Sequence, residues 1–315
     1  MRAYFTALAV SLWREAALTA CLCCTAVQAA TPTATTIIFT GDILLDRGVR
    51  TEIERHGADH LFSKSVDDVF RSADVVVGNL ECPATTIHSP MQKRFIFRAE
   101  PVWLNTLRQH GFTHLNLANN HSVDQGRRGL MDTRRNILRA GITPVGADST
   151  MEAASQPTLL ARQPRPVWMI ASLRLPLENY AYLPHRPCVS QEPMDSLLAR
   201  VRRLKAADPS CAVIVSLHWG AEHTLQPTPS QRLEARRLIR AGADALVCHH
   251  THTLQTVEHF RGKPIYYSIG NFIFDQQKPL NSKAAMVKIS VTADSIKATA
   301  IPITIHRCTP RLSSH

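Results

Sequence analysis

The sequence predicts an α/β fold, and three observations lead to this prediction. Short apolar segments typical of buried strands alternate with amphipathic segments that have helical spacing. Several apolar segments end abruptly in a carboxylate, an amide or an imidazole, as parallel strands do where their carboxyl ends form a site. A chain of 315 residues with 44% hydrophobic and 19% charged residues has the composition of a globular protein with a large core.

The domain organisation predicted from the sequence is simple. No internal repeat, low-complexity segment or clear linker divides the chain after its N-terminal leader. We therefore expect one domain over residues 36–306, preceded by an export signal at 1–29 and followed by a tail at 307–315.

The leader has the features of an export signal. Arg2 and Arg14 supply positive charge, residues 16–27 are apolar, and Ala29 offers a small residue at a cleavage site. The charged pair at residues 14–15 excludes one continuous membrane span over 3–27.

Two kinds of cleavage fit the leader. The segment ending at Cys21 resembles a bacterial lipobox, which would make Cys21 a lipidated N-terminus, and cleavage near Ala29 is the alternative. In both cases we expect an exported protein that is periplasmic or associated with the cell envelope. Its contact with the membrane would be only through the leader or a lipid anchor.

Charge and cysteine content limit the function further. The formal net charge is +11, which favours an anionic substrate or surface, although solvated helix faces explain many of the arginines. No basic segment is interleaved with aromatic residues, so we expect no nucleic acid partner. Five cysteines follow Ala29, an odd and widely spaced number that does not form a disulfide framework. One or two bridges would be compatible with an oxidising compartment.

Strands and helices alternate along the first half of the chain. The pattern predicts strands at 36–40, 74–78, 113–117 and 144–146, and helices at 61–72, 101–110 and 126–140. Pro101 at a helix start and Gly141 after a helix end support these boundaries.

The second half continues the alternation and then changes character. Strands are expected at 167–171, 212–217, 245–247 and 265–268, and helices at 194–207 and 229–242. Residues 173–193 contain four prolines and little periodicity, so we expect a long loop or lid there. Residues 285–291 and 297–305 alternate as an antiparallel closing pair.

The segment 245–252 is the most informative part of the sequence. A short buried strand ends in His249, His250 and His252. Imidazole is a common ligand for transition metals, and residues two apart in extended backbone share a face. The alternative is a solvated polar loop after a strand.

Five predicted strands end in side chains that can ligate a metal. They are Asp42, Glu81, Asn120 with His121, His218, and His250 with His252. Because parallel strands place their carboxyl ends on one edge, these side chains should meet in one crevice. Mixed nitrogen and oxygen ligands suit Mn, Fe or Zn, and seven groups exceed the four that one tetrahedral ion takes. We therefore expect one or two divalent ions, with a two-metal centre preferred.

The order of these motifs resembles that of the CapA family, the poly-γ-glutamate capsule biosynthesis proteins, within the calcineurin-like metallophosphoesterase superfamily. The matching motifs are Gly41-Asp42, Asn79-Leu80-Glu81, Ala118-Asn119-Asn120-His121 with Asp124, Leu217-His218-Trp219-Gly220 with Glu222, His249-His250-Thr251-His252, and Tyr267-Ser268-Ile269-Gly270-Asn271-Phe272. The resemblance covers residues 36–305, and it implies a four-layer α/β/β/α sandwich with the metals on one edge.

The resemblance also implies roles for individual residues. Asp42 and His252 would hold the first metal, Glu81 would bridge, and Asn120, His218 and His250 would hold the second metal. His121 would be the catalytic imidazole. Two departures concern the first metal site: the superfamily usually opens with Asp-x-His, whereas Ile43 and Leu44 follow Asp42, and Glu81 replaces an Asp.

Residues around these ligands have weaker assignments. Asp124 would orient His121, or it would cap the following helix. We expect Arg47, Asn119 and Asn271 to contact the substrate, although an arginine of this kind is a surface charge by default.

The sequence thus predicts a metal-dependent hydrolase of a phosphoester or amide bond, linked to poly-γ-glutamate, capsule or surface-polymer biosynthesis. The alternative is a non-catalytic accessory protein that binds or guides an anionic polyglutamate chain. Expected partners are an anionic polymer or phosphoester substrate and membrane components of a polyglutamate synthase.

Overall fold

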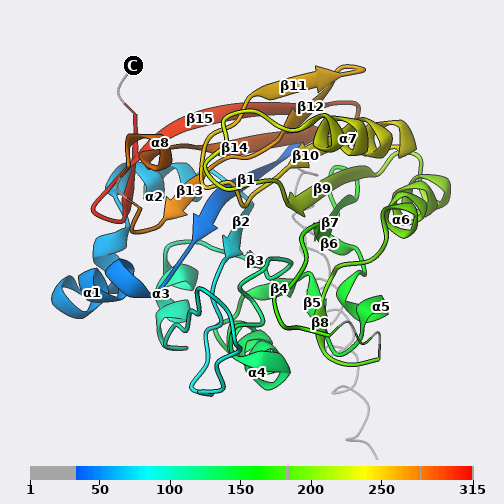
Figure 1. Ribbon diagram of the computed structural model, residues 1–315. Coiled ribbons are helices and arrows are strands. Elements are labelled where there is room, and N and C mark those ends of the chain that lie inside the picture. The colour runs from blue at the N-terminus through cyan, green and yellow to red at the C-terminus, as the bar shows by residue number, and fades with distance from the viewer. Residues whose placement is uncertain (1–32, 182, 184, 277, 314–315) are drawn as a thin grey trace, which may run out of the picture. The chain divides into compact units, whose positions relative to one another are not determined.

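We analysed a computed structural model, which describes residues 33–181, 183, 185–276 and 278–313 (Figure 1). The predicted export signal at 1–29 and the lipidation site at Cys21 lie outside the described residues. The described chain contains two large β-sheets with helices on their outer faces.

The first sheet contains eight strands. They are β1 (Ala34–Ile43), β2 (Val75–Leu80), β3 (His114–Asn116), β4 (Thr143–Val145), β13 (Asn271–Ile273), β14 (Lys283–Thr292), β15 (Ile296–His306) and β16 (Thr309–Leu312). The order is β16-β15-β14-β1-β2-β3-β4, and β13 also pairs with β1. Strands β1 to β4 run parallel, whereas β14, β15 and β16 are antiparallel to their neighbours.

The second sheet contains six strands. They are β6 (Thr158–Ala161), β7 (Val167–Leu173), β9 (Ala212–His218), β10 (Ala245–Val247), β11 (Val257–Phe260) and β12 (Lys263–Tyr266), in the order β11-β12-β10-β9-β7-β6. Its four central strands are parallel, and the edge strands β6 and β11 are antiparallel. A small additional sheet pairs β5 (Ala147–Asp148) with β8 (Cys188–Val189).

Helices cover the outer face of each sheet. They are α1 (Arg47–His56), α2 (Lys64–Arg71), α3 (Trp103–Gln109), α4 (Gly126–Arg139), α6 (Met194–Ala207) and α7 (Pro229–Ala241), with short helices α5 (Met151–Ala154) and α8 (Pro279–Ser282) elsewhere. Helix α7 begins with a capping box in which Thr228 and Gln231 bond reciprocally, and Gly242 ends it with a left-handed φ of 116°.

Side-chain alternation along the strands produces three stacked cores. In β1, Ile37 and Phe39 point into the core between the sheets, whereas Ile38 points into the core shared with α1 to α4. In β9, Ile214 faces the first sheet, and Val215 faces α6 and α7. The α/β prediction and the four-layer α/β/β/α arrangement are therefore confirmed.

The structure differs from the sequence prediction mainly in short elements. Helix α1 was not predicted, because only Val49 and Ile53 are apolar and buried in it. Strand β16 lies in the segment predicted as a tail, where it extends the first sheet by pairing with β15. The segment 173–193 is largely irregular, as expected, and contains the short strand β8.

The parallel strands give the sandwich two distinct ends. The carboxyl ends of β1, β2, β3, β9 and β10 lead into the predicted ligands, and we call this end the carboxyl edge. At the opposite end, the amino edge, Arg165 donates hydrogen bonds to the carbonyls of Ser210 and Ser295 and so connects turns of the two sheets. Within the described residues, no helix is both long and apolar enough to span a bilayer.

A close backbone contact fixes the carboxyl edge at Gly41. A Cβ atom at this position would lie 2.1 Å from the carbonyl oxygen of Gly270, next to Asp42 and Asn271. We expect Gly41→Ala to lower the free energy of unfolding by about 1–3 kcal/mol, because backbone must move, and also to weaken metal binding. Denaturant unfolding and metal titration measure the two effects.

Gly57→Ala is the matched control. Gly57 has a positive φ of 83° and open space around it, away from the carboxyl edge. Backbone strain should cost a similar amount of stability, about 1–3 kcal/mol, without changing metal affinity. Equal metal affinity in the two variants would contradict the proposed role of the Gly41 contact.

Candidate metal centre

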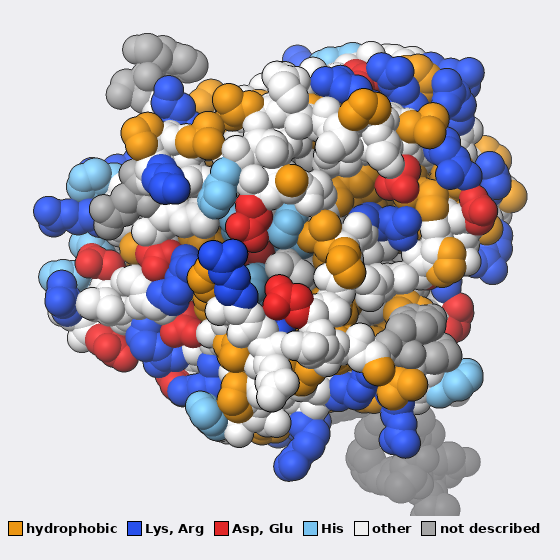
Figure 2. Space-filling view, in the orientation of Figure 1, with side chains coloured by type: hydrophobic (Ala, Val, Ile, Leu, Met, Phe, Trp, Pro, Cys, Tyr) orange, Lys and Arg blue, Asp and Glu red, His pale blue; other side chains and the backbone are white. Residues whose placement is uncertain are grey.

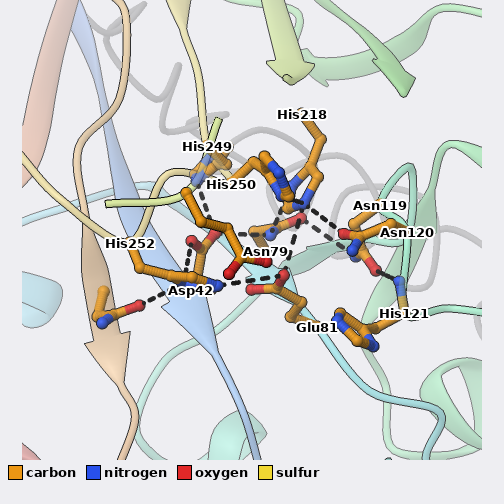
Figure 3. A network of polar contacts seen from close by, with 12 residues as sticks. Asp42, Asn79, Glu81, Asn119, Asn120, His121, His218, His249, His250 and His252 are labelled. Carbon is orange, nitrogen blue, oxygen red and sulfur yellow. Dashed lines mark hydrogen bonds and ion pairs between the residues drawn. The ribbon is translucent and has the colours of Figure 1, made fainter. Parts of the chain in front are cut away.

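The predicted ligands meet at the carboxyl edge, although they come from both sheets (Figure 3). Asp42 lies near the end of β1, Glu81 directly after β2, and Asn120 after β3. His218 ends β9, and the loop after β10 carries the remaining histidines. All these side chains except Asn120 are buried, so their polar atoms need partners inside the protein.

One group of possible ligands contains Asp42, Glu81 and His252, whose ligand atoms lie within 4.8 Å of one another. The Nδ1 atom of His252 is 3.3 Å from Asp42 Oδ2, and its Nε2 atom is 4.0 Å from Glu81 Oε1. This is the set that the family resemblance implied for the first metal.

A second group contains Glu81, His218 and His250, also within 4.8 Å. His218 Nε2 lies 3.5 Å from Glu81 Oε1, 3.2 Å from His250 Nδ1 and 2.8 Å from Asn120 Oδ1. Asn120 therefore adds an oxygen to this group, as the resemblance implied for the second metal.

The carboxylate of Glu81 belongs to both groups. Both of its oxygens and Asp42 Oδ2 are buried and have no hydrogen-bond partner among the described residues. A buried carboxylate without a partner costs several kcal/mol, and a divalent cation removes this cost. The donor set of carboxylates, imidazoles and one amide thus fits two divalent ions that share Glu81.

The ionisation of the carboxylates reflects this crowding. Burial raises the pKa of Glu81 well above its ordinary value, and the charge of Asp42 adds to the effect. Burial also acts to raise the pKa of Asp42, but the imidazoles of His249 and His252 outweigh it and hold that pKa well below its usual range.

The pKa values of the histidines also shift in different directions. Burial, reinforced by the charge of His252, lowers the pKa of His250 to about 3, and burial lowers the pKa of His218 well below its ordinary value. Burial opposes protonation of His252 too, but Glu81 and Asp42 raise its pKa to about 9. His218 and His250 are therefore neutral at pH 7, as metal binding requires.

The loop after β10 holds its histidines in strained backbone. His250 has φ of 100° and His252 has φ of 55°, both in the left-handed region that non-glycine residues rarely adopt. Asn281 donates a 2.8 Å hydrogen bond to the carbonyl of His252 and so supports this conformation. Strain of this kind persists where surrounding contacts over-determine the backbone, which is common at functional sites.

His121 lies beside the second group of ligands. Its Nδ1 atom is 2.8 Å from Asp124 Oδ2, which also accepts a 2.9 Å bond from the amide of Phe97. The other oxygen of Asp124 forms a buried ion pair with Lys93, and Lys93 also donates to the carbonyl of Asn120 at 2.8 Å. Asp124 therefore orients His121, in agreement with the first of the two roles considered for it.

The three predicted substrate contacts have different environments. Arg47 is partly exposed, pairs with Asp275, and lies over the rings of Phe97 and Phe274 at 5.0 and 5.4 Å. These rings pack against His121 and His252 at 4.3 and 4.7 Å, so Arg47 lies near the entrance of the centre.

Asn119 and Asn271 are fully buried and bonded to protein groups. Asn119 Oδ1 accepts from the amide of His121 at 3.1 Å, and Asn119 Nδ2 donates to the carbonyl of Leu80 at 2.9 Å. Asn271 Oδ1 lies 2.9 Å from His252 Nδ1. Their contacts position the loops of the candidate metal centre, and the substrate contacts predicted for them stay predictions.

Sequence reasoning assigned no role to two residues of the centre. Asn79 donates to Asp42 Oδ1 at 2.8 Å and lies 3.3 Å from His218 Nδ1, so it connects the two groups. His249 Nδ1 is 3.3 Å from Asp42 Oδ1 and has no hydrogen-bond partner in the described chain. His249 is thus an additional imidazole beside Asp42, where the usual Asp-x-His motif would supply a second ligand for the first metal. Asn79 ends a buried strand, a signal that could have identified it.

The five cysteines that the structure describes form no disulfide with one another. Cys82, Cys188, Cys211, Cys248 and Cys308 are free and buried in the described part of the chain. Burial raises the pKa of Cys248 to about 12, so it is a protonated thiol beside the histidine loop. It therefore behaves as a small core residue.

Comparisons with known proteins show which family the chain resembles. The family model described as bacterial capsule synthesis protein PGA_cap matches residues 36–276. The PGA biosynthesis protein CapA of Bacillus subtilis is 32% identical over 279 residues, which cover 86% of this chain and 72% of that protein. The capsule biosynthesis protein CapA of Bacillus anthracis is 29% identical over 291 residues, or 88% of this chain and 69% of that protein. A probable polyglutamine synthesis accessory protein of Mycobacterium tuberculosis is 28% identical over 297 residues, covering 79% and 77%.

Because the Glu81 carboxylate has no hydrogen-bond partner in the described chain, we expect Glu81→Gln to change stability in opposite directions without and with metal. In metal-free protein at pH 7, Glu81→Gln should raise the free energy of unfolding by about 1–3 kcal/mol, because it removes a group whose pKa is raised by burial. In saturating Mn²⁺ or Zn²⁺ the same variant should be less stable than the wild type, because a shared ligand is lost. Denaturant unfolding with and without metal measures both effects.

Asp244→Asn is the control for this reversal. Asp244 is also buried, and burial acts to raise its pKa, but Lys205 and Lys263 at 2.6 and 2.8 Å outweigh this and hold that pKa below its ordinary value. Its neutral variant should be destabilised by about 1.5–3 kcal/mol in both conditions. A loss of stability in metal-free Glu81→Gln would contradict the unpaired state of that carboxylate.

His250 predicts acid sensitivity of the metal-free protein. Its pKa is about 3 in the folded state against an ordinary value of 6.5, so between these pH values only the unfolded chain binds the proton. Stability should fall as pH falls through this window, with a contribution of up to about 1.4 kcal/mol per pH unit. His250→Asn should make the dependence shallower, whereas His259→Asn, at an exposed position, should leave the slope unchanged. Chemical unfolding between pH 4 and 7 tests this, and equal slopes in wild type and His250→Asn would exclude it.

Proposed function

The chain belongs to the bacterial capsule synthesis protein family, and we propose that it is an exported, metal-dependent hydrolase acting in the assembly of poly-γ-glutamate or a related surface polymer. The bond cleaved is a phosphoester or an amide. The single observation that carries the enzymatic part of this proposal is the carboxylate of Glu81, which is shared by two ligand groups and has no hydrogen-bond partner among the described residues.

Residues from both sheets would hold the metals. Asp42, Glu81 and His252 would hold one divalent cation, and Glu81, Asn120, His218 and His250 would hold the other. Such cations would supply Lewis acidity, which polarises the bond to be broken and lowers the pKa of water, so that water loses a proton and becomes a nucleophile. Asn79 fixes the relative positions of the Asp42 and His218 side chains, because its amide contacts both.

His121 is the residue best placed to move a proton. Since the Asp124 carboxylate accepts from Nδ1, the neutral ring carries its proton there and keeps a free lone pair on Nε2. Burial lowers the pKa of His121 although Asp124 opposes this, so the neutral form prevails at pH 7. The ring lies beside Glu81 in Figure 3, and Nε2 can accept a proton during attack and return it to the leaving group.

Arg47 supplies the part of the site that selects the substrate. Its guanidinium is partly exposed above two aromatic rings that flank the centre, and Asp275 holds it in place. A carboxylate or phosphate adjacent to the scissile bond would complement this group. The proposed substrates, glutamyl polymers and phosphoesters, both carry such an anion.

The accessory alternative differs from this proposal in what the metal centre does. A relative in Mycobacterium tuberculosis is named a probable accessory protein of polyglutamine synthesis. In that role the chain would bind an anionic polymer without turnover. Association with synthase components in the membrane would be compatible with either role.

The enzymatic proposal predicts metal-dependent turnover. Protein loaded with Mn²⁺, Fe²⁺ or Zn²⁺ should hydrolyse either a chromogenic phosphodiester or poly-γ-glutamate, and EDTA should abolish this activity. His121→Asn should lower kcat by about 10²–10⁴-fold without changing metal content, because only proton transfer is lost. His218→Asn should lower both metal content and activity.

His114→Asn is the control for these variants. His114 is a buried histidine at the start of β3, away from the ligand groups. It should retain metal and turnover. Stoichiometric metal without turnover on either substrate class, together with polymer binding that survives His218→Asn and His252→Asn, would favour the accessory role instead.

A further inference from the structure

The amino edge of the sandwich carries an unusual set of charges. Six exposed basic residues on or near this edge have no carboxylate within ion-pair distance in the described part of the chain: Arg162, Arg202, Arg203, Arg240, Arg261 and Lys297. We call this set the basic edge. By contrast, Arg47, Arg50 and Arg98 beside the metal centre each pair with an acidic side chain.

Chain topology explains why these residues gather. Arg162 lies in the turn before β7, Lys297 follows the turn that ends β14, and Arg261 lies in the turn before β12. Arg202, Arg203 and Arg240 lie in the C-terminal halves of α6 and α7, which return the chain to the amino ends of β9 and β10. Figure 2 shows Lys and Arg side chains gathered over these helices.

Three arginines of α7 and the β11–β12 turn surround the ring of Phe260. The guanidiniums of Arg240, Arg236 and Arg261 lie 4.9, 5.4 and 5.8 Å from the centre of this ring. Of the three, Arg236 pairs with Glu258. The helix dipole favours Arg240 at the end of α7, but Arg261 is in a hairpin turn and receives no such stabilisation. Unpaired like charges repel each other, and an external anion would relieve the repulsion.

The described domain also begins at this edge. Strand β1 starts at Ala34, and Thr35 bonds to the carbonyl of Gln163 in the turn that follows Arg162. The 32 residues that precede the described chain therefore join the domain beside the basic edge. Their sequence predicts an export signal with a possible lipidation site, which is the part of the protein expected to reach a membrane.

We propose that the basic edge docks on the headgroups of an anionic phospholipid bilayer. The metal centre, at the opposite end of the parallel strands, then faces away from the membrane. The basic residues come from five separate segments and cover an edge of the domain, which complements a plane of charges better than a single extended chain. This inference does not depend on hydrolysis, because it concerns the end of the fold remote from the metal centre.

Vesicle cosedimentation of the full chain tests the proposal. Wild-type protein should bind vesicles containing phosphatidylglycerol more tightly than pure phosphatidylcholine vesicles, and salt should reduce the difference. Each basic residue near an anionic bilayer strengthens binding roughly fivefold, so Arg240→Gln/Arg261→Gln should weaken it roughly 25-fold. Any contribution of the leader is the same in both proteins and cancels in this comparison.

A second variant that loses the same number of charges elsewhere distinguishes binding by the basic edge from an effect of net charge. Arg94→Gln/Arg128→Gln removes two exposed arginines near the metal-centre end and should retain most of the phosphatidylglycerol affinity. Equal losses in the two double variants, or no preference of wild type for phosphatidylglycerol, would overturn the proposal. So would unchanged vesicle binding by Arg240→Gln/Arg261→Gln with lost binding to soluble polyglutamate. Thermal unfolding of each variant verifies that the fold is intact.

Discussion

The structure depends on one electrostatic constraint, which is the placement of two carboxylates side by side in a buried site. Asp42 and Glu81 are fully buried, and three of their four carboxylate oxygens have no hydrogen-bond partner among the described residues. The imidazoles of His218 and His252 lie 3.5 and 4.0 Å from Glu81 Oε1, so they compensate for this arrangement only in part. A divalent cation would supply the remaining positive charge, and the neutral His218 and His250 are suited to coordinate it.

This constraint explains why the fold uses two sheets. A single parallel sheet would supply ligands from one row of strand ends, all on one side of a crevice. Here β1, β2 and β3 supply Asp42, Glu81 and Asn120, while β9 and β10 face them with histidines. The core between the sheets, built from residues such as Phe39 and Ile214, fixes the separation of the two rows. Close packing at Gly41 and Gly270 then allows β13 to pair with β1 and to place Asn271 against His252.

The sequence predicted the long periodic elements and the ends of buried strands, because both depend on local pattern. It therefore predicted Asp42, Glu81 and His252 as neighbours correctly. It did not assign a role to Asn79 or His249, since their contacts with Asp42 and His218 join different strands and depend on how the two sheets pack. Helix α1 has two buried apolar residues, and β13 has three residues, so neither produces a detectable period. The roles of Asn119 and Asn271 were also hidden, because an amide that bonds protein and one that bonds substrate have the same local sequence.

The two ends of the sandwich use charge in opposite ways. At the carboxyl edge several charges have a partner within the protein, and even Lys93 is neutralised by Asp124 where it supports His121. Such pairing holds side chains in one geometry and reduces the electric field that these charges produce in the solvent. At the amino edge, Arg240 and Arg261 share an aromatic ring without an acidic partner, so their field extends into solvent. The formal net charge of +11 is therefore not a uniform property of the surface. Parallel strands separate the candidate metal ligands from the basic edge, because the ligands collect where the strands end and the connecting turns collect where they begin.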